Sequence, residues 1–212
     1  MEKEIFQKNI FMKSIKNFLN ESIENEDYLS ESALDMEGDK AEILKWIKDN
    51  YTFNGRLSIT KDFVVNCTGS VFIKNESITS LTNGMFKWGK INKDFTCGWS
   101  KELRTLKGAP EYVGVSFGCV LCKNLETLEG APKYVGLDFN CSLCDNLTNL
   151  EGAPKEVGRH FECSRCKNLK SLAGAPEKIG GSLDCHGCDK LSITDDDRKK
   201  YNMESFEVEL SN

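Results

Sequence analysis

The sequence predicts a solenoid, a stack of similar coils, over most of its 212 residues. Four near-identical blocks of 22 residues follow one another and start at Leu103, Leu125, Leu147 and Leu169. All four prolines of the chain occupy the same position in these blocks. A fixed period of this length indicates an array in which each unit buries its apolar side against its neighbours.

Each block contains a segment with the alternation of a short strand, for example Phe139-x-Cys141-x-x-Cys144. Side chains alternate along a strand, so we expect Phe139 and Cys141 to point into the coil and Asn140 to point out. Equivalent residues of neighbouring coils then stack at about 4.8 Å. Gly-Ala-Pro and Val-Gly complete the block, and these residues are typical of tight turns.

The segment from Phe139 to Leu147 resembles the leucine-rich-repeat core Leu-x-Leu-x-x-Asn/Cys-x-Leu. The resemblance covers residues 103–194 well and residues 57–102 loosely. It implies a leucine-rich-repeat solenoid with short parallel strands on one face and turn-rich return segments behind them, without long helices. Gly-Ala-Pro and Val-Gly resemble the return segments of compact bacterial and phage-borne repeats of this family.

Two degenerate coils precede the four regular ones. One lies between Leu57 and Cys67, and the other contains Asp94-Phe95-Thr96-Cys97, which falls 22 residues before the equivalent segment at Phe117. We therefore expect three parts: an acidic helical N-terminal region at 1–56, a leucine-rich-repeat solenoid at 57–194, and a C-terminal cap at 195–212. Terminal units of a solenoid differ from internal ones because their outer side faces water.

Three helices are expected outside the repeats. The spacing of apolar residues predicts an amphipathic helix within residues 1–35, and a second helix starts at Asp39 and ends before the turn Asn54-Gly55. Thr194 and the three aspartates after it predict the start of a short C-terminal helix. The apolar stripe of the first helix consists of Phe11, Ile15, Phe18, Leu19 and Ile23, and that of the second of Ile43, Leu44, Ile47 and Tyr51.

The charge distribution argues against a nucleic-acid partner. The net charge is −5, and residues 1–50 carry all of it, while acids and bases balance over the remainder. Nucleic-acid affinity depends largely on Lys and Arg contacts to phosphates. No stretch approaches the roughly 20 apolar residues that span a bilayer, and the N-terminus lacks the features of a secretory signal. We therefore expect a cytoplasmic protein whose ten cysteines remain thiols.

The cysteines allow two interpretations. Four Cys-x-x-Cys pairs, which begin at Cys119, Cys141, Cys163 and Cys185, resemble zinc knuckles and would support a zinc-stabilised module, perhaps one for nucleic acid. The alternative, which we favour, is that both cysteines of each pair pack in the core as small apolar residues. No metal or other cofactor is then needed. No single thiol has a base partner, so catalysis by cysteine is not expected.

The outward positions of the coils form the candidate site. Trp99, Leu121 and Leu143 share one column, and an exposed apolar strip of this kind often marks an interface, although the N-terminal helices could cover it. Both histidines of the chain lie on the same face. We expect a non-catalytic protein–protein interaction module, for which an inhibitor of a host protein encoded by a phage or mobile element is one specific form. The candidate partner-binding residues are Trp99, Val120, Leu121, Asp138, Asn140, Leu143, His160, Glu162, Arg165, Asp184 and His186.

Overall fold

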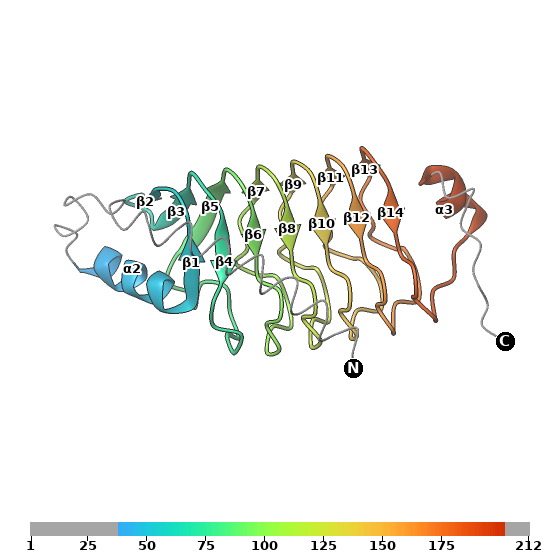
Figure 1. Ribbon diagram of the computed structural model, residues 1–212, viewed down its shortest axis with the longest axis horizontal. Helices are drawn as coiled ribbons and strands as arrows, with labels where there is room; N and C mark the ends of the chain where they lie inside the picture. Colours follow the sequence, from blue (N-terminus) through green and yellow to red (C-terminus); the bar gives the residue numbers. More distant parts are fainter. Residues whose placement is uncertain (1–37, 202–212) are drawn as a thin grey trace. The chain divides into compact units, whose positions relative to one another are not determined.

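The computed structural model describes residues 38–201, which form a parallel β-solenoid (Figure 1). Residues 1–37 and 202–212 lie outside the described part, and with them the helix predicted within residues 1–35. Successive coils of the solenoid contribute one short strand to each of two seven-stranded sheets, which we call sheet A and sheet B. The solenoid that the 22-residue period predicts is therefore confirmed.

The two sheets run side by side along the stack. Sheet A consists, in spatial order, of β1 (Tyr51–Phe53), β4 (Val71–Ile73), β6 (Phe95–Thr96), β8 (Phe117–Gly118), β10 (Phe139–Asn140), β12 (Phe161–Glu162) and β14 (Leu183–Asp184). Sheet B consists of β2 (Leu57–Ile59), β3 (Val64–Cys67), β5 (Lys87–Ile91), β7 (Tyr112–Val113), β9 (Tyr134–Val135), β11 (Glu156–Val157) and β13 (Lys178–Ile179).

Neighbouring coils pair in parallel, in the register that the period requires. Phe139 lies between Phe117 and Phe161 in sheet A, and Tyr112 lies beside Tyr134 in sheet B. Six strands of each sheet are linked by parallel pairing. The described chain therefore forms six coils, as predicted, of which the last four are regular.

The prediction that strands occupy only one face of the coil is wrong. Each return segment contains a short strand, of two residues in the four regular coils, and these strands build most of sheet B. In β9, Val135 is buried and Tyr134 is exposed, so the inside–outside alternation of a strand is present. Two residues are too few for that alternation to be recognised in a sequence.

The first coil also lies elsewhere than the sequence predicts. Leu57–Ile59 is an antiparallel strand at the end of sheet B, and the first coil consists of β3 and β4. Val71 lies beside Phe95 and takes the place of the phenylalanine of later coils. These two residues are 24 apart in the sequence, so an offset of 22 does not find the equivalent position.

Helix α2 and two antiparallel strands cover the N-terminal end of the solenoid. Helix α2 (Asp39–Asn50) starts where it was predicted and buries Ile43, Leu44 and Ile47. Strands β1 and β2 pair antiparallel with β4 and β3, and they join at the predicted Asn54-Gly55 turn. Tyr51 belongs to β1 rather than to the helix, and its hydroxyl donates a hydrogen bond to the Leu81 carbonyl oxygen at 2.9 Å. β1 and β2 are therefore the edge strands of sheets A and B at this end, and each has only three residues.

Stacked copies of the same side chain fill the interior. The rings of Phe95, Phe117, Phe139 and Phe161 stack almost parallel, with centroids 5.1 to 5.6 Å apart. All four are at most 1% exposed. Burial of each such side chain stabilises the fold by roughly 1.5–3 kcal/mol. The core is therefore a continuous column and not a set of separate domain cores.

The C-terminal end carries the predicted short helix, α3 (Asp195–Lys200). The Thr194 hydroxyl accepts a hydrogen bond from the Asp197 amide, and the Asp197 carboxylate accepts one from the Thr194 amide, which is a capping box. Tyr201 follows the helix and donates a hydrogen bond from its hydroxyl to the Pro176 carbonyl oxygen at 3.0 Å. This contact attaches the cap to the last coil.

Candidate functional site

On the outer face of sheet A, equivalent residues of successive coils line up in rows, and most of these rows carry polar side chains. Each two-residue strand buries its first residue and leaves its second half-buried on the outer face. One row of this face therefore runs Thr96, Gly118, Asn140, Glu162 and Asp184. Three of the predicted site residues lie in this row.

Asp138 lies in the row formed by the residues that directly precede the sheet A strands. It is held by Arg159, which is not among the site residues predicted from the sequence. The Arg159 Nε and Nη2 atoms donate to the two carboxylate oxygens of Asp138, with the Nε contact at 2.8 Å. The Asp138 side chain is 20% exposed and that of Arg159 is 54% exposed. Hydrogen bonding to the guanidinium lowers the pKa of the Asp138 carboxyl. Asp138 is thus neutralised within its own chain.

His160 follows Asp138 in the same row and links two coils. Its backbone amide donates to Asp138 Oδ1 at 3.2 Å. Its ring Nδ1 accepts a hydrogen bond from the Ser182 amide at 3.2 Å and lies 2.8 Å from the Ser182 hydroxyl. Because Nδ1 is an acceptor in this geometry, the ring proton of the neutral imidazole is on Nε2. His160 therefore has a structural role in the face and presents Nε2–H.

Glu162 and Asp184 form the most acidic part of the face. They lie side by side on β12 and β14, and both are half-buried. Glu162 accepts a hydrogen bond from Asn140 Nδ2, and within residues 38–201 neither carboxylate has a salt bridge. Burial, together with the charges of Asp138 and Asp184, raises the pKa of Glu162. This part of the face would gain from a nearby positive charge.

The next row contains Val120, Ser142, Ser164 and His186. Val120 is half-buried, and His186 is exposed on the last coil. The His186 amide donates to Asp184 Oδ1 at 2.9 Å, and the Ser164 amide donates to the Ser142 hydroxyl at 3.1 Å. The Ser164 hydroxyl is buried and has no hydrogen-bond partner among residues 38–201. His160 and His186 belong to different rows, as the sequence indicated.

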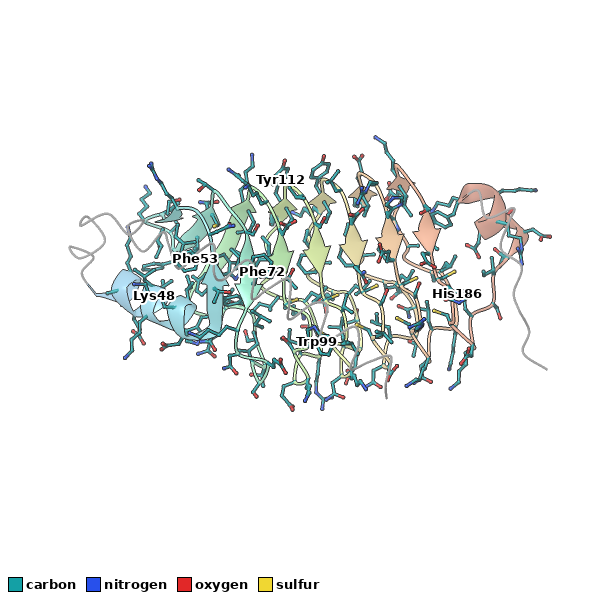
Figure 2. The ribbon with its side chains drawn as sticks, viewed as in Figure 1. Lys48, Phe53, Phe72, Trp99, Tyr112 and His186 are labelled. Carbon is teal, nitrogen blue, oxygen red and sulfur yellow. The ribbon has the colours of Figure 1, made fainter. Side chains whose placement is uncertain are left out.

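The predicted exposed apolar strip requires a correction. Trp99, Leu121, Leu143 and Arg165 do align from coil to coil, but Leu121 is only 4% exposed, and Trp99 and Leu143 are half-buried. All four have a left-handed backbone, with φ between 57° and 68°. The sheet A strands end three residues before this position, so the alternation of a strand does not fix the side-chain direction there. Figure 2 shows Trp99 below the strands of sheet A.

The paired cysteines connect coils through hydrogen bonds. The second thiol of each pair donates to the carbonyl oxygen of a cysteine one coil earlier, at 3.1 to 3.3 Å. All ten cysteines are free, and nine are buried. Over residues 38–201, no three or more His, Cys, Asp or Glu side chains are grouped as metal ligands. The geometry is that of a core ladder.

The site thus combines Asp138, Asn140, His160, Glu162 and Asp184 on one face, with His186 and Arg165 beside it. Among the described helices, none is long and apolar enough to cross a membrane. Comparison of the chain with protein families, with curated proteins and with solved structures found no match.

Proposed function

We propose that the protein is a non-catalytic interaction module, and that a protein partner binds the outer face of sheet A in its last three coils. The observation that carries the proposal is the pair Glu162 and Asp184. Both carboxylates are half-buried, both face the same side, and neither has a cationic partner among the described residues. A fold that only had to be stable would gain nothing from this arrangement.

The chemistry of the face favours a basic partner. Lysine or arginine side chains of the partner would pair with Glu162 and Asp184, and an arginine can bind a carboxylate with two hydrogen bonds. Asn140, Ser182 and His186 surround the acidic pair with donors and acceptors that suit the polar rim of an interface. The same carboxylates would repel the phosphates of a nucleic acid.

The relationship of this solenoid to leucine-rich repeats is also part of the proposal. We infer a leucine-rich-repeat relationship from the Leu-x-x-Leu spacing and from the cysteine at the Asn/Cys position. Cys144 occupies that position, and its thiol donates to a backbone carbonyl of the previous coil. An acidic face suits one specific form of this function. In that form the protein is an inhibitor, encoded by a phage or mobile element, that binds a basic surface of a host protein.

Affinity capture with the purified full chain tests the proposal. The variant Glu162→Lys with Asp184→Lys reverses the charge of the face, and we expect it to lose a partner that co-purifies with the wild type in fixed stoichiometry. Glu151→Lys with Glu177→Lys is the matched control, because it makes the same change in net charge at two exposed glutamates that form no salt bridge with another described residue. Circular dichroism establishes that each variant is folded.

Two outcomes would count against the proposal. One is that the Glu162 and Asp184 variant retains the partner as well as the control does. The other is that no protein binds the wild-type chain in fixed stoichiometry. A captured partner whose contact surface lacks lysine and arginine would refute the charge argument specifically.

A further inference from the structure

A groove lies beside sheet B, where the coils depart from the regular repeat. It has a volume of about 660 Å³ and is lined mainly by residues of the second and third coils, among them Phe86, Trp88, Gly108 and Tyr112, with Val64 from the first coil. Figure 2 shows Tyr112 at the upper edge of the solenoid and Trp99 at the lower edge in that view. The residues that line the groove come from strands of sheet B and from the segments that precede them, so the groove is separate from the sheet A face.

Unequal strand lengths in sheet B create the groove. Strand β5 has five residues, whereas its neighbour β7 has two. Pairing between them begins at Lys90, which lies beside Tyr112. Lys87 and Trp88 pair with β3 on one side, and no strand of the described chain pairs with them on the other. The Lys87–Gly89 part of β5 thus presents an open strand edge to the groove, and such an edge can accept an extended peptide.

The floor of the groove is aromatic and rigid. Phe86 is 6% exposed and Trp88 is 3% exposed, and their rings meet edge to face with centroids 5.1 Å apart. Trp88 Nε1 donates a hydrogen bond to the Leu81 carbonyl oxygen at 3.2 Å, which fixes the indole. Gly108 and Ala109 also line the groove, and neither has a side chain larger than a methyl group.

The rim of the groove is positively charged. Within the described residues, Lys87 and Lys90 have no salt bridge, while Glu111 is already paired with Lys133 at 3.1 Å. Lys90 Nζ lies 4.6 Å from the centre of the Tyr112 ring. Tyr112 stacks on Tyr134, which is one of two large apolar side chains that stand out as exposed in the described chain. Aromatic residues with neighbouring cations are typical of interface hot spots.

We propose that this groove binds an extended acidic peptide segment of another protein. The peptide backbone lies along the open side of Lys87–Gly89, its acidic side chains pair with Lys87 and Lys90, and an apolar side chain packs above Phe86 and Trp88. A nucleic acid fits less well, because only two unpaired lysines and one glutamate border the groove. This inference is independent of the proposed function, which concerns the other sheet and a partner of opposite charge.

Selection from a random peptide library displayed on phage, with the immobilised full chain as target, tests the inference. We expect the enriched peptides to share acidic residues next to an apolar one. The best of them, synthesised with a fluorophore, is then titrated by fluorescence anisotropy. Lys87→Glu with Lys90→Glu should weaken its binding roughly tenfold or more, as expected when opposite charges are replaced by like charges.

Lys155→Glu with Lys170→Glu is the matched control, since both lysines are exposed and form no salt bridge within the described part of the chain, and we expect it to bind the peptide as the wild type does. The inference is overturned if the enriched peptides lack acidic residues, if none is enriched, or if both double variants bind equally well. Loss of peptide binding in the Glu162→Lys with Asp184→Lys variant, but not in the groove variant, would place the peptide on sheet A and also overturn the inference.

Discussion

The Cys144 thiol donates a hydrogen bond to the carbonyl oxygen of Cys119, one coil earlier, across 3.2 Å. Cys122, Cys166 and Cys188 make the equivalent contact in their own coils. The repeated Cys-x-x-Cys motif therefore combines an apolar packing role for its first residue with a coil-to-coil hydrogen bond from its second. This role accounts for the spacing of the motif without a metal.

The buried thiols should make the protein less stable in alkaline solution. Burial raises the pKa of Cys141 and Cys163, and it raises that of Cys185 to about 12. An unfolded chain releases thiol protons near pH 8.5. Above that pH the folded chain binds more protons than the unfolded chain, so the free energy of unfolding falls, by up to about 1.4 kcal/mol per pH unit for each such thiol. Urea denaturation at several pH values between about 8 and 10 measures the slope, and a constant free energy of unfolding over this range would contradict the prediction.

Alkylation of the native protein provides the control for this interpretation. Cys188 is the one cysteine that is not fully buried, so it should react first with iodoacetamide. The other nine should react only after unfolding. If several of them react as fast as Cys188 in the native state, the thiols are not enclosed in the core as described.

The sequence predicted the parts of the fold that depend on the period. An offset of 22 residues places Phe117 beside Phe139 and Asn140 beside Glu162, because parallel coils of equal length repeat every contact. Sheet B escaped prediction because its regular strands have two residues. The burial of Leu121 escaped because a left-handed residue follows the end of the strand and redirects the side chain.

Two features of the candidate surfaces depend on departures from the period. Arg159 reaches Asp138 across 21 residues, so no comparison of equivalent positions connects them. The groove beside Trp88 arises because β5 is longer than β7, and a sequence that lacks the regular block at this point does not indicate strand lengths. Such contacts are determined by side-chain reach and by local chain length, which become visible only in the folded coil.

The glycines of the repeat should differ sharply in their tolerance of alanine. Gly152 has φ +89°, and a Cβ there would lie 2.4 Å from the Glu129 backbone nitrogen. Gly118 has no such φ, and a Cβ there would meet Thr96 Cγ2 at an ordinary 3.6 Å. We expect Gly152→Ala to lower the free energy of unfolding by more than about 1 kcal/mol and Gly118→Ala to have little effect or to raise it slightly. Thermal denaturation of both variants measures the difference, and equal effects would show that backbone approach does not limit this position.

Glu162→Gln should stabilise the protein near neutral pH while it weakens partner capture. The folded chain raises the pKa of Glu162, so the ionised carboxylate opposes folding above its unfolded pKa of about 4.3. Glutamine keeps an oxygen that can accept the hydrogen bond from Asn140 and removes the charge beside Asp138 and Asp184. We expect a gain of less than about 1 kcal/mol at pH 7, because the site is partly exposed.

The gain should vanish below about pH 4, where Glu162 is protonated in both states of the wild type. Glu126→Gln is the control, since it breaks the exposed pair with Arg104 and should leave stability unchanged or slightly reduced at pH 7. Urea denaturation at both pH values distinguishes the variants, and a loss of stability in Glu162→Gln at pH 7 would mean that the carboxylate supports the fold. A gain in stability together with weaker capture would instead identify Glu162 as a residue that costs stability and serves binding, which is the trade-off expected at a functional surface.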